Sequence, residues 1–175
     1  MEQDMDVPPL MQALFSEEWD KAMSLIEEGA KVNHKDWIGI TPLHLAARCS
    51  KPDVVRLLLE KKADANAITY KMRAPGGYCP LTCLADANHR QLSQGDIVGT
   101  ASLLFEGMNA ETFARQTGTE RTLWHLLCCR GKYELVDWLL RKFDQRHGRL
   151  ALADQFNIIK DMGVWGKGKR ALDDA

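Results

Sequence analysis

The sequence predicts a mainly α-helical solenoid, in which hairpins of two short helices stack along one axis. The first observation is a gap-free match between residues 9–33 and residues 42–66, in which proline, leucine, aspartate, alanine and asparagine recur 33 positions later. The second is a match from residues 41–59 to residues 122–140, at an offset of 81 positions. One unit of this length cannot bury its own apolar side chains, so several units must stack to form a continuous core.

The clearest unit is centred on residues 41–47, which read Thr-Pro-Leu-His-Leu-Ala-Ala. Thr41 suits the N-terminal cap of a helix, and Pro42 suits its first position, where the missing N–H is not needed. A turn containing Gly39 precedes the motif, and residues 53–60 follow it as a second helix. This pattern resembles the ankyrin repeat, a unit of about 33 residues made of a β-turn and two helices, whose signature is T-P-L-H-x-A.

The resemblance implies a role for each residue of the motif. Leu43 and Leu45 are expected to face the helices of adjacent repeats, and the small Ala46 and Ala47 to let paired helices approach closely. His44 has the chemistry of a metal ligand or a base, but the matching histidine of the family hydrogen-bonds the turn backbone. We therefore expect a structural role for His44.

The same frame divides the chain into four repeats within one domain of residues 1–175. The first repeat spans about residues 8–35, with a degenerate first helix, and the second spans about residues 36–68. A terminal repeat meets water on its outer side, which favours polar residues there. The expected polar cap contains Gln12, Glu17 and Glu18.

The third repeat, about residues 69–116, matches the second at an offset of 38 positions, which places about five extra residues between positions 70 and 76. Thr82 replaces the signature histidine. The second helix of this repeat arrives about seven residues late. The polar stretch 89–96 is therefore expected to be a longer loop between the two helices.

The fourth repeat, about residues 117–146, retains the signature threonine and histidine and has Gly131 between its helices. Residues 147–175 are expected to form a C-terminal cap helix and a tail, because apolar residues at 152, 156 and 159 have helical spacing. The basic cluster at 167–170 has two open interpretations, a localisation or phosphate-binding patch and a solvated tail.

Composition and charge argue against several classes of protein. Hydrophobic residues make up 45% of the chain and charged residues 27%, which is ordinary for a globular domain. The formal net charge of −1 gives no global basic surface for nucleic acid, and no apolar run approaches the ~20 residues of a membrane span. Residues 1–6 are acidic and unlike a signal peptide, so we expect a cytoplasmic or nuclear protein.

The five cysteines are an odd number and fit the reduced thiols of an intracellular protein. Cys83 is expected to be buried at a core-facing helix position, where cysteine acts as a small hydrophobe. Cys79, Cys83 and His89 have a spacing that suggests zinc, but the repeat frame supplies no fourth ligand. Cys128 and Cys129 are adjacent, which suits one tetrahedral site poorly. No metal and no cofactor are therefore expected.

The favoured function is a protein–protein interaction module or adaptor, because solenoids present an extended concave surface to partners. The sequence contains no nucleophile elbow, P-loop, dinucleotide-binding glycine pattern or zinc-protease motif, so an enzyme is not expected. Two alternatives stay open, a structural subunit of a larger assembly and a microbial effector. The expected partner is a protein rather than nucleic acid or a membrane, and the chain is expected to be a monomer or part of a hetero-complex.

In the ankyrin family, partners usually bind the hairpin tips and the exposed side of the first helices. The tip positions in this chain are Trp37, Ile38, Ile40, Tyr70, Met72, Arg73 and Tyr78. The first-helix positions are Arg48, Asp86 and Arg130. Trp37 and Ile38 are the leading candidates, because large apolar residues at a tip do not help the core and tryptophan is enriched among binding hot spots. The alternative is that Trp37 folds back over the adjacent loop.

Further positions carry structural expectations. Leu58 matches leucines in the first and fourth repeats and is expected in the core. Lys62 stands where the first repeat has Gly29, so it is expected to adopt a left-handed conformation that glycine adopts more easily. Asn33 and Asn66 match each other and are expected to stabilise hairpin turns.

Overall fold

The computed structural model describes residues 7–70, 77–86, 94–109, 112 and 123–147. These residues are mainly helical, and none of them lies in a β-strand. The helices are α1 (Pro9–Phe15), α2 (Trp19–Glu27), α3 (Pro42–Arg48), α4 (Pro52–Glu60), α5 (Pro80–Asp86), α6 (Gln94–Gly107), α8 (Leu123–Cys129) and α9 (Tyr133–His147). Within the described ranges, no helix combines the length and the apolar character that crossing a bilayer requires.

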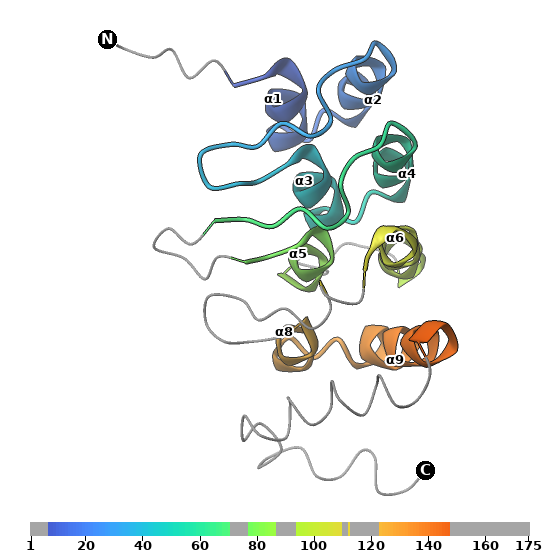
Figure 1. The fold of residues 1–175 in the computed structure, drawn as a ribbon. Coiled ribbons are helices and arrows are strands. Elements are labelled where there is room, and N and C mark those ends of the chain that lie inside the picture. Colours follow the sequence, from blue (N-terminus) through green and yellow to red (C-terminus); the bar gives the residue numbers. More distant parts are fainter. Residues whose placement is uncertain (1–6, 71–76, 87–93, 110–111, 113–122, 148–175) are drawn as a thin grey trace, which may run out of the picture.

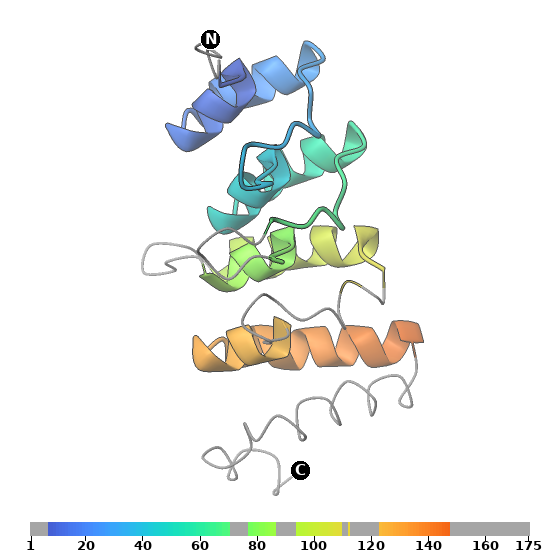
Figure 2. The same cartoon turned by 60° about the vertical axis from the view of Figure 1, so that its left-hand side comes forward.

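The helices of the described part form four successive hairpins that stack in one direction (Figure 1). Helices α1, α3, α5 and α8 form a first row, and α2, α4, α6 and α9 form a second row beside it (Figures 1 and 2). Helices of one row contact their partners in the other row and their neighbours in the next hairpin. A continuous core therefore runs along the stack.

Helix α3 begins as the sequence predicts. Thr41 precedes it in an extended conformation, and Pro42 occupies the first helical turn. The backbone N–H of Thr41 donates to Nδ1 of His44 over 3.2 Å, and the Thr41 hydroxyl lies 2.8 Å from the same nitrogen. The cap is therefore shared between the threonine and the histidine of the motif.

The core is built from the residues that the motif places inside the stack. Leu43 and Leu45 are buried, and Leu58 is fully buried, as predicted. The matching Leu139 is also fully buried, whereas Leu25 is only partly buried. Leu25 lies on α2 at one end of its row, so among the described residues it has a neighbouring hairpin on one side only. The exposed residues at this end include Gln12, Glu17 and Glu18.

Left-handed backbone conformations recur at matching positions of the frame. Gly29 follows α2 with a φ of +94°, and Lys62 follows α4 with a φ of +66°, which confirms the predicted conformation of this lysine. Between the two helices of a hairpin, Glu17, Ser50 and Gly131 have φ values of +57°, +49° and +66°. These three residues are spaced by 33 and 81 positions, the offsets of the sequence matches.

The two matching asparagines connect consecutive hairpins rather than closing their own turns. Asn33 Nδ2 donates to the carbonyl of Lys62 over 2.9 Å, and its Oδ1 accepts the backbone N–H of Asp64 over 2.8 Å. Asn66 repeats both bonds one hairpin later, to the carbonyl of Gly107 at 3.1 Å and to the N–H two residues beyond it at 2.9 Å. The expected role in a single hairpin is therefore replaced by a role between hairpins.

Two expectations are wrong. Cys83 is half-buried rather than buried, because its short side chain fills less space than Leu45 does at the matching position of α3. Cys79 is the buried thiol instead. Residues 94–96, expected in a loop, begin α6, where the carboxylate of Asp96 favours a helix N-terminus. The predicted cap and tail lie outside the described residues, except that α9 continues to His147.

Candidate protein-binding surface

A tight turn at residues 36–40 presents the first group of predicted tip residues. Oδ1 of the Asp36 carboxylate accepts the backbone N–H groups of Ile38 at 3.0 Å and of Ile40 at 2.7 Å. The backbone N–H of Gly39 donates to the carbonyl of Asp36 at 3.0 Å, and its φ of +83° favours glycine. Because the turn is closed by its own residues, the side chain at position 37 is held at a defined place.

Trp37 lies at the tip of this turn and has 64% of its surface exposed, the largest fraction among the large hydrophobic residues that the structure describes. This exposure contradicts the alternative in which Trp37 folds back over the adjacent loop. Ile38 and Ile40 are half-buried, and Ile40 packs against the core. The turn therefore offers Trp37 and part of Ile38 to solvent, while Ile40 mainly supports the stack.

Tyr70 lies against the same turn. Its backbone N–H donates to the carbonyl of Ile38 over 2.7 Å, and half of its surface is exposed. A Cβ at Gly39 would lie 3.1 Å from the nitrogen of Tyr70 and 3.2 Å from Cδ2 of its ring, so glycine permits this close approach. Nζ of Lys35 lies 5.9 Å from the centroid of the Tyr70 ring, within cation–π range. Direct contacts thus join Lys35 and Ile38 to Tyr70, and Trp37 precedes Ile38 in the turn. We call Lys35, Trp37, Ile38 and Tyr70 the tip surface.

Sequence reasoning missed Lys35 as a member of this surface. A single lysine in a loop is ordinary, and no sequence pattern marks it. Its position over the ring of Tyr70 depends on a contact between residues 35 positions apart. Met72 and Arg73, which were expected at the same tips, lie outside the described residues.

Tyr78, also expected at a tip, lies at the base of its hairpin. Its backbone N–H donates to Oγ1 of Thr69 over 3.1 Å, and its carbonyl accepts the backbone N–H of Thr69 over 3.0 Å. Its side chain is half-buried and packs against the core. These contacts give Tyr78 a structural role and leave less of it available to a partner than Trp37 or Tyr70 offers.

His44 connects α3 to the base of this hairpin. Its Nε2 lies 3.1 Å from the carbonyl oxygen of Tyr78, which can only accept, so Nε2 carries the proton. Nδ1 then accepts the hydrogen bonds from Thr41. Burial lowers the pKa of His44 to about 4, which keeps the imidazole neutral at neutral pH. The predicted structural role is confirmed. Among the described side chains, no three histidines, cysteines or carboxylates gather as a metal site would need.

The first-helix candidates lie apart from the tip surface. Arg48 is the last residue of α3, and the turn leads into the other end of this helix, about 10 Å away at 1.5 Å per residue. Arg130 follows α8, and α5 packs between α3 and α8. Arg48 and Arg130 are exposed, and Asp86 ends α5. Arg48 and Arg130 therefore do not belong to the same local surface as Trp37.

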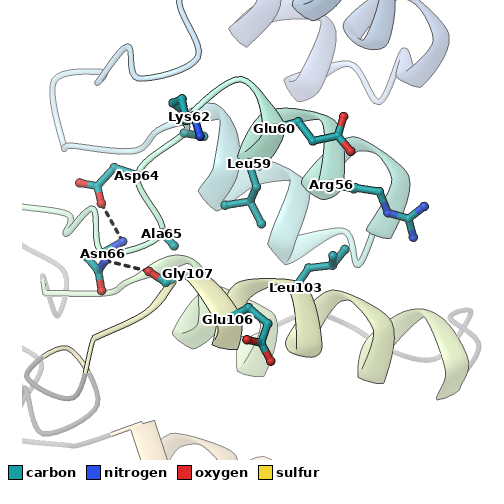
Figure 3. A pocket seen from close by; sticks show the side chains of 11 residues that line it. Arg56, Leu59, Glu60, Lys62, Asp64, Ala65, Asn66, Leu103, Glu106 and Gly107 are labelled. Atoms are coloured by element: carbon teal, nitrogen blue, oxygen red, sulfur yellow. Dashed lines mark hydrogen bonds between the residues drawn. The ribbon is translucent and has the colours of Figure 1, made fainter.

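An open groove of about 600 Å³ lies between α4 and α6 in the second row (Figure 3). Arg56 and Glu60 come from α4, and Leu103 and Glu106 come from α6. The remaining lining residues are Leu59, Lys62, Ala63, Asp64, Ala65, Asn66 and Gly107. Both cations and carboxylates line the groove, so its charge selects neither anions nor cations. Sequence reasoning did not predict this feature, because it forms between helices separated by an insertion.

Comparison with known proteins finds a match to the part of the chain that holds α3 and α4. A family model described as ankyrin repeat matches residues 38–70. Two ankyrin repeat proteins of Fowlpox virus (strain NVSL) are similar to parts of the chain. FPV233 is 50% identical over 48 residues, which are 27% of this chain and 9% of that protein. FPV216 is 39% identical over 70 residues, which are 39% of this chain and 24% of that protein.

The chain therefore matches less than a quarter of the length of either relative. The matched family segment begins at Ile38 and ends at Tyr70, so it includes α3, α4 and two residues of the tip surface. Residues 38–70 therefore match the ankyrin repeat, and the chain is similar over part of its length to ankyrin-repeat proteins.

Proposed function

We propose that the chain is a protein-interaction module that binds a protein partner through its hairpin tips and its concave face. Ankyrin repeats generally mediate protein–protein interaction and are typically not enzymes. The arrangement of the described helices in two stacked rows suits this role, because solenoids offer extended surfaces to partners. The single observation that carries the proposal is the exposed Trp37 on a hydrogen-bonded turn.

The repeat organisation is part of the proposal. The four helical hairpins of the described residues support repeats at about 8–35, 36–68, 69–116 and 117–146, in one domain of residues 1–175. The recurrence of left-handed residues at 17, 50 and 131 supports the same frame. Residues 147–175 would then form the C-terminal cap and tail.

Trp37 is expected to contribute binding energy rather than stability. A tryptophan that is 64% exposed makes few core contacts, and exposed aromatic residues are frequent hot spots of interfaces. The tip surface adds Tyr70 and Lys35 to it. By the same proposal, Arg48, Asp86 and Arg130 would contribute contacts on the concave side.

The test is affinity capture with the full chain as bait, followed by quantitative mass spectrometry. Trp37→Ala should remove at least one captured protein while leaving the melting temperature within about 2 °C of the parent, as expected for a surface change below about 0.5 kcal/mol. Val7→Ala is the control, because Val7 is also a large hydrophobic residue with 50% of its surface exposed, but it precedes α1 and is not one of the four residues of the tip surface. Equal capture by all three proteins would contradict the proposal.

The alternative function is a subunit of a larger assembly or a microbial effector. The viral source of both relatives favours the effector within this alternative. The two functions differ in what happens to the tip surface. A permanent subunit would keep Trp37 covered, so Trp37→Ala would reduce the yield of the assembly rather than the capture of a separate partner.

A further inference from the structure

We infer that the tip surface binds a segment of the partner that places a carboxylate beside an aliphatic or aromatic side chain. This inference rests on the proposed function and specifies the partner of the same surface. It follows from what the four residues of the surface expose, from the position of the lysine, and from the direction of the nearest carboxylate.

The apolar part of the surface is large for one hairpin. Trp37 is 64% exposed and Tyr70 is 50% exposed, although both belong to loops whose backbones are hydrogen-bonded to one another through Ile38. Exposed aromatic residues on a fixed backbone lose little conformational freedom when they are covered. This part of the surface therefore suits an aliphatic or aromatic side chain of a partner.

The cation of the surface is available for pairing. Lys35 is exposed and has no carboxylate within ion-pair range among the described residues; its contact there is with the ring of Tyr70. The ring holds the ammonium group beside the apolar area. A partner that covers Tyr70 would bring its own groups next to Lys35. A carboxylate at that place would form an ion pair with the ammonium group, whereas an apolar group would leave the ammonium partly dehydrated and unpaired.

The neighbouring carboxylate does not cancel this preference. Asp36 is half-buried, and its Oδ1 accepts two backbone N–H groups of the turn, so the carboxylate is directed toward the backbone. Lys31, in the same loop, is exposed. The exposed charged side chains of this loop are therefore both lysines, although the whole chain has a formal charge of −1.

Aromatic residues beside lysine are also found where proteins bind single-stranded nucleic acid, through base stacking and phosphate contacts. Such binding needs a positively charged groove that follows the nucleic-acid backbone. The tip surface has one lysine that lies over an aromatic ring, and its described residues form no such groove. The chain as a whole is slightly acidic. A protein segment is therefore the better fit, and nucleic acid is an outcome that the test must exclude.

The test begins with a phage-displayed library of random ten-residue peptides, selected on the full chain and counter-selected on Trp37→Ala. The expected peptides contain Asp or Glu within three positions of a large apolar residue. One enriched peptide is then synthesised with a fluorescent label, and its Kd is measured for the parent chain, for Lys35→Glu and for Lys61→Glu. Lys61 is an exposed lysine at the end of α4, away from the tip surface, and serves as the matched control.

Lys35→Glu should weaken binding by about threefold to fivefold, the factor expected from an exposed ion pair of up to about 1 kcal/mol. Lys61→Glu should leave the Kd unchanged, and a peptide whose acid is replaced by lysine should bind Lys35→Glu better than it binds the parent. This reciprocal gain is the pairwise coupling that a double-mutant cycle measures.

Three results would overturn the inference. Peptides that depend on Trp37 but show no preference for acids would leave the proposed function intact and remove the charge preference. A selection without Trp37-dependent peptides would contradict both. A labelled ten-residue oligothymidine that binds the parent chain, and binds Lys35→Glu at least threefold more weakly, would assign the surface to nucleic acid instead.

Discussion

His44 donates a hydrogen bond from Nε2 to the backbone carbonyl of Tyr78, 3.1 Å away in the hairpin that follows its own repeat. The bond joins α3 to the loop that leads into α5 and requires the proton to be on Nε2. Nδ1 accepts from Thr41 on the other side of the ring. A second proton on His44 would therefore remove an acceptor inside the core, which makes the connection between the hairpins sensitive to acid.

Stability is expected to fall as the pH decreases from about 6.5 to about 4. Burial lowers the pKa of folded His44 to about 4, so in this window the unfolded chain binds a proton that the folded chain does not bind. The difference between the two pKa values corresponds to a loss of about 3 kcal/mol in the free energy of unfolding across this pH window.

The free energy of unfolding should be measured by urea denaturation at several pH values for the parent and for His44→Gln. The variant should be less stable than the parent at pH 7, and its stability should change less with pH over this window. An NMR titration of His44 with a midpoint near 6.5 would contradict the prediction.

Leu58→Ala is expected to destabilise the protein by about 2–5 kcal/mol, because Leu58 is fully buried between helices and its loss leaves a cavity. Leu57→Ala, on the same helix but half-buried, should cost less. The measurement is the free energy of unfolding from urea denaturation of all three proteins. A cost for Leu58→Ala within about 0.5 kcal/mol, as at surface positions, would show that the packing of α4 is not as described.

Lys62→Gly is expected to be neutral or to stabilise the protein by up to about 1 kcal/mol, because Lys62 has a φ of +66° that glycine adopts without strain. Gly29→Ala provides the reciprocal variant. Gly29 has a φ of +94°, and a Cβ there would meet no atom within 4 Å, so any cost would come from the backbone alone. Thermal unfolding should show opposite shifts for the two variants, and a clear loss of stability in Lys62→Gly would mean that the lysine side chain contributes more than the strain removes.

Asn66→Ala is expected to destabilise the protein by about 1–2 kcal/mol, and more than Asn33→Ala does. Asn66 joins two hairpins through the carbonyl of Gly107 and the N–H of Asn109. The Thr112 hydroxyl adds a shared third bond, because its one proton faces Asn66 Oδ1 at 2.9 Å and Asn109 Oδ1 at 2.7 Å. Asn33 makes two such bonds and is more exposed. Hydrogen bonds at such exposed or partly exposed positions are at the low end of the usual range, so each lost bond is expected to cost about 0.5 kcal/mol. Equal costs in urea denaturation would indicate that the third bond adds nothing to stability.

The sequence predicted features that belong to a single repeat and missed contacts between successive repeats. The cap at Thr41, the burial of Leu58 and the conformation of Lys62 follow from matches 33 or 81 positions apart, where the spacing identifies equivalent residues directly. The contact of Tyr70 with Gly39 joins the start of the third repeat to the turn of the second. Sequence matches identify equivalent positions but not which side chains of successive repeats touch, so the sequence identified Tyr70 as a tip residue but did not place Lys35 over its ring.

The same limit applies to the asparagines. Asn33 and Asn66 were recognisable as a pair because they are 33 positions apart, but their bonding partners lie 29 and 41 positions further along the chain. The difference of 12 positions is the extra length of the third repeat. An alignment reveals the shared residue, whereas the shared bond becomes visible only when the insertions are placed in space.

Gly39→Ala tests the connection on which the tip surface depends. The new Cβ would lie 3.1 Å from both the Tyr70 nitrogen and the Thr69 Cα, which are backbone atoms that cannot rotate away, and the φ of +83° adds strain. A loss of about 1–3 kcal/mol in the free energy of unfolding is expected, as for other strained backbone positions. Gly99→Ala is the control, because the nearest atom to its Cβ is Cβ of Pro52 at 3.8 Å, an ordinary contact.

In NMR spectra, Gly39→Ala should also shift the amide signal of Tyr70, whose N–H donates to the carbonyl of Ile38. An unchanged Tyr70 signal and unchanged stability would show that the two loops are not in contact, and the tip surface would then reduce to Trp37 and its immediate neighbours.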